Sequence, residues 1–277
     1  MEVFIQEVDP ELAIKLLGKN YEKQRNINKN WANDLAREMS DGRWRECGDN
    51  QIVIDVNGNL INGQHRMLAV IKSGTTQKFL FQTGVPTDYY DVMDTNRKRS
   101  VADAIGGKNR NSKSAIASFG AGIQRGLRIE YCMVGQRVTK TESIEYYNEN
   151  AQSLEIVSDY FEMFKRSIGK AAPLGVGAAM WIYWNISPEI VEYAVEDIRN
   201  DVPQDQRVAT YKTQCMKEII RENFDKERQF AMTIRLFEAI KDDKDLPKRI
   251  NSPKKIIETW QKKINLWRNN PLSNILQ

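Results

Sequence analysis

The sequence predicts an α+β protein, in which a small α/β domain at residues 1–107 precedes an α-helical domain at residues 108–277. Before Gly106-Gly107, short apolar runs with strand-like alternation lie between short helical patterns, and after it every apolar pattern has the helical period. Hydrophobic residues make up 41% of the 277 positions, which is enough for a sizeable core. The stretch Gly106-Gly107-Lys108-Asn109 has the composition of a boundary.

The first elements have clear start and stop signals. Val3-Phe4-Ile5 predicts a short strand. Asp9 before Pro10 is typical of a helix start, with the aspartate as N-cap and the proline in the first turn. Gly18 ends this helix, and a second helix is expected from about residue 28 to residue 42.

The next elements change period. Residues 51–61 alternate around Asn57-Gly58, which predicts a β-hairpin with a two-residue turn. A helix is expected over 64–72, a strand over 78–82, and a short helix after Pro86. These elements together form a small α/β unit.

The second domain reads as helical throughout, with proline and glycine at several ends. Trp181, Tyr183 and Trp184 lie in an apolar helix and are expected to pack in the core, as are Trp260 and Trp267, seven residues apart. The expected helices span 112–127, 141–166, 171–185, 188–199, 206–223, 226–241 and 253–268.

Several classes of protein are disfavoured. The most apolar run, 174–186, is shorter than the roughly 20 residues of a spanning helix, and the N-terminus has no leader-like pattern, so we expect a soluble cytoplasmic protein with no membrane partner. Three distant cysteines indicate neither a disulfide framework nor a zinc site. The single histidine, His65, excludes a metal site built on several imidazoles.

Charge is distributed unevenly. The net charge is +4, but residues 96–128 carry eight bases and one acid, and residues 208–277 carry 15 bases and nine acids. Basic segments attract phosphate backbones, although solvated helix faces give the same composition. Nucleic-acid contacts are expected from two groups of side chains, Arg97, Lys98 and Arg99, and Lys108, Arg110 and Lys113.

The segment with the clearest chemistry joins a strand, a glycine and a helix, as Leu60-Ile61-Asn62-Gly63-Gln64-His65-Arg66. The first turn of a helix has unpaired N–H groups and the positive end of the dipole, so it binds anions. Gly63 lets a ligand approach the backbone, and Arg66 can bind two phosphate oxygens at once. His65 can donate to a phosphate or carry a proton. A plain glycine turn with surface side chains is the alternative.

Asn62-Gly63-Gln64-His65-Arg66, followed by Leu68-Ala69, resembles the GQHR signature of the ParB/sulfiredoxin superfamily in its phage and prophage form. The order of the other features agrees over roughly residues 1–105, from Gln24-Arg25 to the stretch that begins at Asp94-Thr95. The resemblance implies a ParB/sulfiredoxin-like α/β fold with a nucleotide-phosphate pocket at the motif. It implies a nucleoside triphosphate ligand with Mg²⁺.

The resemblance also suggests roles for individual residues. Asn62, Gly63, Gln64, His65 and Arg66 would bind the nucleotide. Arg25 would be a second phosphate clamp. The candidates for catalysis are His65 and Glu22, the nearest carboxylate on the loop that carries Arg25.

These observations lead to one hypothesis about function and two alternatives. We expect a ParB-like protein that binds a nucleotide, hydrolyses it or transfers its phosphoryl group, and associates with DNA. The first alternative is an inactive adaptor that binds DNA or protein, such as a phage regulator or an anti-defence factor; Asn62 favours it, since an amide is no base and a poor Mg²⁺ ligand. The second is a metal-dependent nuclease, which would need a cluster of acids.

Overall fold

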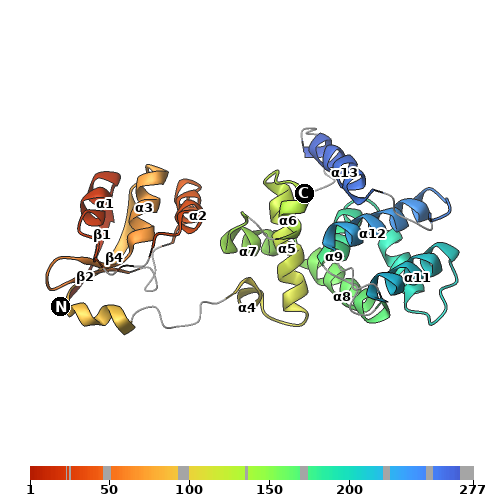
Figure 1. Cartoon of the computed structure of the whole chain (residues 1–277), viewed down its shortest axis with the longest axis horizontal. Helices are drawn as coiled ribbons and strands as arrows, with labels where there is room; N and C mark the ends of the chain where they lie inside the picture. The colour runs from red at the N-terminus through yellow and green to blue at the C-terminus, as the bar shows by residue number, and fades with distance from the viewer. Residues whose placement is uncertain are drawn as a thin grey trace. The chain divides into compact units, whose positions relative to one another are not determined.

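The computed structural model describes residues 1–22, 24, 26–45, 51–92, 100–134, 137–168, 174–220, 225–247 and 252–268. The chain divides into two compact units, Met1–Lys98 and Arg99–Gln277. The first contains a four-stranded sheet with helices and the second is helical, which confirms the predicted α+β class (Figure 1). Among the described residues, no helix is both long enough and apolar enough to cross a membrane.

The first unit is built around a mixed sheet with the strand order β1-β4-β2-β3. Strands β1 and β4 pair antiparallel, as do β2 and β3, whereas β2 and β4 are parallel. Helices α1, α2 and α3 cover one face (Figure 1). The elements are β1 (Glu2–Val8), α1 (Pro10–Leu17), α2 (Lys29–Ser40), β2 (Ile52–Asp55), β3 (Leu60–Asn62), α3 (Gln64–Ser73), β4 (Gln77–Val85) and the 3-10 helix η2 (Thr87–Val92).

The predicted cap begins the first helix, and a side-chain cap also begins the second helix at its expected start. The Asp9 carboxylate accepts from Leu12 N at 2.8 Å, and the Asn28 side chain accepts from Trp31 N at 3.1 Å. Each bond satisfies one of the amides that a helix start leaves unpaired. Short-range signals therefore place both helix starts correctly.

The predicted hairpin joins β2 to β3, but residues 56–59 separate the two strands, so its connection is longer than the predicted two-residue turn. Asp55 fixes this connection. This carboxylate accepts from the backbone amides of Asn57 at 2.9 Å and Asn59 at 2.7 Å, and from the hydroxyl of Thr87 at 2.8 Å. Burial raises the pKa of Asp55, but the hydrogen bonds from Asn59, Thr87 and Asn57 outweigh it and hold the pKa below the ordinary value. An ionised Asp55 is thus part of the hairpin.

The core of this unit lies between the sheet and its three helices. It contains residues of every element on that face, with Ile52, Met67, Val70, Phe79 and Phe81 at its centre. A smaller cluster, Val53, Ile61 and Val85, lies apart from this core and is covered by Tyr21 and by Tyr90 of η2. Leu60 and Ile61, which follow one another in β3, therefore lie in different clusters.

The second unit is entirely helical in its described residues. Its core includes Trp181 and Tyr183, each 2% exposed, which confirms that these aromatic side chains pack inside. Its helices are α4 (Val101–Ile105), α5 (Arg110–Gln124), α6 (Ile129–Met133), α7 (Lys140–Glu149), α8 (Ala151–Ile168), α9 (Leu174–Trp184), α10 (Pro188–Ile198), α11 (Gln206–Ile220), α12 (Lys226–Lys241) and α13 (Pro253–Arg268).

The second unit differs from the predicted pattern in three places. The single helix expected over 141–166 is two helices, α7 and α8, separated at Asn150. Helices α4 and α6 were not expected, because each has only five residues. Helix α4 packs against α5 and α7, so residues from Ser100 onward lie with the second unit, although the predicted boundary is at residue 107.

Candidate functional site

The predicted motif occupies the junction between β3 and α3. Strand β3 ends at Asn62 and α3 begins at Gln64, so the turn is confined to Gly63. Gly63 has φ 121° and ψ 1°, a conformation that L side chains rarely adopt, and a Cβ there would lie 2.6 Å from Ile52 Cδ1. Among the described residues, no side-chain cap bond is formed at this helix start.

The loop of residues 18–28, which joins α1 to α2, lies beside this junction in its described residues. Leu60 N donates to Lys19 O at 2.8 Å, and Tyr21 N donates to Leu60 O at 3.0 Å. The side chain of Gln24 donates to the same Leu60 carbonyl at 3.3 Å. The structure therefore brings the loop of residues 18–28 against the motif, although some 40 residues of chain separate them.

Gln64 and His65 attach this loop to the helix. Both side chains are buried, at 3% and 7% exposed. Asn20 Nδ2 donates to Gln64 Oε1 at 3.1 Å, and the backbone amide of Asn28 donates to His65 Nε2 at 2.8 Å. Because Nε2 accepts a hydrogen bond, His65 is the neutral tautomer with its proton on Nδ1. The histidine thus joins the starts of α2 and α3.

Arg66 is half-buried at the edge of the same junction. Its Nη2 donates to Gln51 O at 2.8 Å and to Asn62 Oδ1 at 2.9 Å. Both of these acceptors are uncharged, and they orient the guanidinium. The amide of Asn62 therefore positions Arg66, a role that its place in the sequence did not indicate.

The remaining predicted site residues lie on the loop. Arg25 is outside the described residues, and the side chain of its neighbour Gln24 donates to the Leu60 carbonyl. Glu22 is exposed on the loop. Asn20 and Asn28 were not predicted as parts of the site. Asn28 had a signal only as a helix cap, and Asn20 had none, because its partner is 44 positions away.

The site has groups that suit the phosphates of a nucleotide but few groups that suit a Mg²⁺ ion. The amides of α3 and the guanidinium of Arg66 suit phosphate oxygens. For Mg²⁺, Glu22 is the single carboxylate among the described residues of the loop and the motif. Within the described chain, no group of three or more His, Cys, Asp or Glu side chains could hold a metal ion. An ion here would depend mainly on phosphate oxygens and water.

The predicted nucleic-acid residues are mostly ion-paired where the structure describes them. Lys108 pairs with Asp159 at 3.6 Å, and Arg110 pairs with Asp103 at 3.5 Å. Arg97, Lys98 and Arg99 lie outside the described residues. Lys108 and Arg110 keep exposed side chains, but each shares its charge with a neighbouring acid.

Lys113 has different surroundings. It is 3% exposed, and its ammonium lies 2.8 Å from Glu155 Oε1 and over the ring of Tyr147. The Tyr147 hydroxyl donates to the same carboxylate oxygen at 2.6 Å. These bonds join α5, α7 and α8. The ammonium of Lys113 is therefore buried and paired with Glu155, and it is not exposed for contact with a backbone phosphate. The sequence pattern did not distinguish it from its exposed neighbours.

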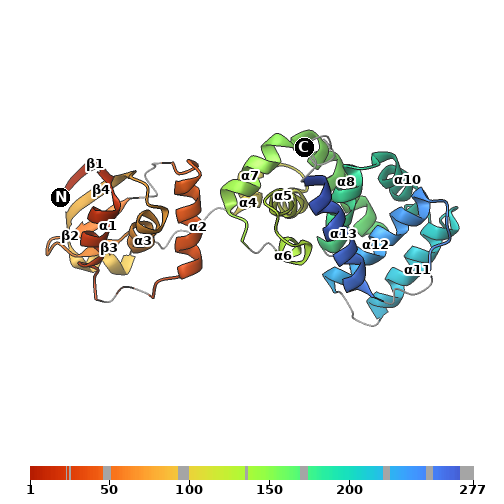
Figure 2. The same ribbon diagram turned by 90° about the horizontal axis from the view of Figure 1, so that it is seen from above.

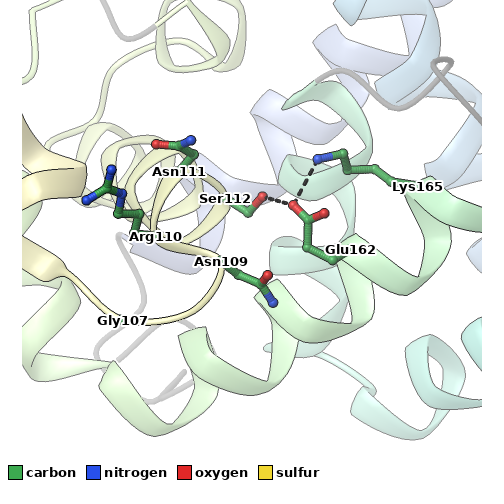
Figure 3. Close-up of a pocket in the computed structure, with 7 residues that line it drawn as sticks. All are labelled: Gly107, Asn109, Arg110, Asn111, Ser112, Glu162 and Lys165. Carbon is green, nitrogen blue, oxygen red and sulfur yellow. Dashed lines mark hydrogen bonds and ion pairs between the residues drawn. The ribbon is translucent and has the colours of Figure 1, made fainter.

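A polar cavity of about 460 Å³ lies at the start of α5 (Figure 3). Ser112 and Lys165 both bind the Glu162 carboxylate there, while Arg110 points away from it. Burial raises the pKa of Glu162, but the bonds from Lys165 and Ser112 outweigh it and keep the pKa below the ordinary value. The ionised carboxylate would repel a phosphate, so this cavity is a poor anion site.

Comparisons with known proteins do not extend the resemblance seen in the motif. No family model, no curated protein and no solved structure matches this chain.

Proposed function

We propose that this chain is a ParB-like protein that binds a nucleoside triphosphate by its phosphates at the start of α3 and associates with DNA. The observation that supports this most is the bonding of the loop of residues 18–28 to the Gly63–Arg66 turn through Gln64 and His65. It unites the two segments that the resemblance implies as phosphate ligands. Arg66 and the α3 amides would bind phosphate oxygens, and Arg25 would assist.

Hydrolysis or phosphoryl transfer belongs to the same proposal. Such a reaction needs mainly positioning and neutralisation of charge, which arginine and helix amides supply. A bound Mg²⁺ would supply positive charge to the phosphates, and Glu22 is the carboxylate of the loop that would help to hold it. Glu22 is the candidate to orient a water, and His65 holds the loop in place. The association with DNA is supported by two basic segments, residues 96–128 with eight bases and one acid and residues 208–277 with 15 bases and nine acids. A location in the cytoplasm is part of the proposal.

The nucleotide is tested by thermal unfolding of the full chain with ATP, GTP, CTP or UTP, each with Mg²⁺. A ligand at about 100 times its dissociation constant adds about 2.7 kcal/mol of stability. We expect a shift with at least one nucleotide in the wild type and none in Arg66→Ala. Arg37→Ala, which removes an arginine ion-paired with Asp34 in the same unit, is the matched control and should keep the shift. No shift in the wild type would contradict the proposal.

The role of His65 is tested by two substitutions. The amide oxygen of glutamine can replace Nε2 as acceptor for Asn28 N, whereas alanine cannot. If His65 only positions the loop, His65→Gln keeps nucleotide binding and phosphate release, and His65→Ala loses both. If His65 carries a proton, His65→Gln binds the nucleotide normally but releases no phosphate.

One observation favours a second function, the inactive adaptor. The polar ends of Gln64 and His65 are directed into the protein, so part of the expected pocket is filled by its own side chains. An adaptor would give no nucleotide-dependent shift while remaining folded and binding DNA or protein. The described residues offer no acidic cluster in favour of the nuclease alternative.

A further inference from the structure

The exposed cations of the second unit differ in whether they have acidic partners. Around the start of α5, where DNA contacts were expected, Lys108, Arg110 and Lys113 each pair with an acid. Lys165 nearby pairs with Glu162. An ion-paired cation must give up its partner before it can neutralise a phosphate. The surface around α5 is therefore less suited to DNA than its composition indicates.

Helix α13 has the opposite character. It contains five bases, Lys254, Lys255, Lys262, Lys263 and Arg268, and one acid, Glu258. Lys263 pairs with Glu238 at 3.4 Å, but in the described part of the chain Lys254, Lys255 and Lys262 have no ion-pair partner. The pKa of Arg128 is raised mainly by its hydrogen bonds with Glu130. The negative charge of Glu258 also raises this pKa, by a smaller amount.

The apolar face of α13 is already packed. Ile257, Trp260 and Ile264 are at most 3% exposed, and the helix lies against α12 and α6 (Figure 2). Gln261 accepts from Ile129 N at 2.7 Å, and Trp260 Nε1 donates to Glu238 at 3.1 Å. The helix is thus held rigidly, with its opposite face turned to solvent.

Lysines lie at the centre of this solvent face. Lys255 and Lys262 are exposed and seven residues apart, which places them two turns and about 10.5 Å apart on one side of the helix. Lys254 lies at the flank of this face. Glu258 lies between the two lysines, within one turn of each, and Thr259, Asn265 and Leu266 are also exposed on this side of the helix. The spacing corresponds to about three nucleotides along one strand at 3.4 Å each.

We propose that this face of α13 binds the phosphate backbone of duplex DNA. This inference rests on the proposed association with DNA and is independent of nucleotide binding. A helix that lies on a membrane buries an apolar face, and that of α13 is occupied by the protein core. Single strands are bound by stacking on exposed aromatic rings, whereas Trp260 is 3% exposed and Trp267 packs on it at 5.9 Å. Lysines on a rigid helix make backbone contacts that do not read sequence.

The test compares two double variants of the full chain that remove the same charge. Lys255→Gln with Lys262→Gln removes the α13 lysines, and Lys108→Gln with Arg110→Gln removes the exposed cations at α5. Binding of a labelled 20-base-pair duplex is measured by fluorescence anisotropy from 50 to 200 mM salt. Circular dichroism establishes that each variant is folded.

The expected result follows from counterion release. Each neutralised phosphate contributes about 0.9 to the salt slope, so a fourfold rise in salt costs roughly 3.5-fold in affinity per contact. The α13 variant should lose about 1.8 from the slope, so that raising the salt weakens it about 12-fold less than the wild type. The α5 variant should keep the wild-type slope.

Three results would overturn the inference. The first is a salt slope that falls equally in both variants or only in the α5 variant. The second is a wild type that binds no duplex. The third is a wild type that binds vesicles with anionic lipids, through Lys255 and Lys262, more tightly than duplex DNA. A nucleotide-dependent thermal shift that persists in any of these cases shows that the nucleotide part of the proposed function stands on its own.

Discussion

Gly63 is the residue at which the backbone of the candidate site is most constrained, so Gly63→Ala is the sharpest perturbation of it. Its φ of 121° is open to glycine but strained for alanine. The added methyl group would lie 2.6 Å from Ile52 Cδ1, and Ile52 is 0% exposed in the core beneath. The substitution therefore combines backbone strain with overpacking.

The two effects have separate magnitudes. A residue held in a sparsely populated backbone region costs about 1–3 kcal/mol, and an extra methyl group in a packed core costs about 1–3 kcal/mol. Rotation of the Ile52 side chain relieves part of the contact. We therefore expect Gly63→Ala to reduce the local unfolding free energy by about 2–4 kcal/mol. Each 1.4 kcal/mol is tenfold, so the amides of α3 should exchange roughly 30- to 700-fold faster.

Hydrogen exchange with mass spectrometry of the full chain measures this change in peptides from α3, with peptides from α9 as the internal reference. Gly58→Ala is the matched control, because Gly58 has φ 83° but no atom within 4 Å of an added Cβ. It reports backbone strain alone. The Ile52→Val substitution removes the Cδ1 atom that the new methyl group would contact. In that background, the loss of protection caused by Gly63→Ala should be smaller than in the wild-type background by about 1 kcal/mol or more.

Equal losses in Gly63→Ala and Gly58→Ala would refute the steric part of this reasoning. An unchanged cost of Gly63→Ala in the Ile52→Val background would show that Ile52 is not the limiting contact. Unchanged exchange in α3 after Gly63→Ala would falsify the whole description of the turn.

Three further predictions concern stability. The pKa of Asp55 is lower in the folded protein than in the unfolded chain, so its ionised carboxylate stabilises the fold fully above the unfolded pKa, and this stabilisation is lost as the pH falls through the folded pKa. Asp55→Asn should therefore be destabilising at pH 7. In urea unfolding, the difference in unfolding free energy between this variant and the wild type should close in acid. Gly175→Ala would place a Cβ 2.1 Å from Lys226 O and should cost about 3 kcal/mol or more in urea unfolding, whereas Gly177→Ala, 3.3 Å from a side chain, should cost about 1 kcal/mol or less. Ser100→Ala breaks the capping box of α4 and should reduce exchange protection there by about 1 kcal/mol; no change would mean that packing alone holds the helix.

Much of the fold could be predicted because its signals are local. The caps at Asp9 and Asn28, the Asn57-Gly58 turn and the bounds of α12 and α13 all depend on residues within a few positions of each other. Asn150 was missed for the same reason. The helical period continues across it, and only the packing of α7 and α8 against other helices shows that the chain turns there.

The contacts of the site could not be predicted, because they join residues distant in sequence. The bond between Asn28 and His65 spans 37 positions, and that between Lys113 and Glu155 spans 42. Nothing in a run of basic residues distinguishes Lys113, which is buried, from Lys108, which is exposed. The motif indicates where chemistry lies, while the tertiary structure decides which side chains remain available for it.

The position of His65 bears directly on mechanism. A ring nitrogen that accepts from the Asn28 amide cannot at the same moment take a proton from a water. If His65 acted as a general base, its Nε2 would first have to release the Asn28 amide, which is one of the bonds that attach the loop of residues 18–28 to α3. Proton transfer by His65 and attachment of Asn28 therefore compete for the same atom. A site that works by positioning and charge neutralisation would avoid this competition, since the proposed ligands Arg66 and the α3 amides would act while His65 keeps its bond to Asn28.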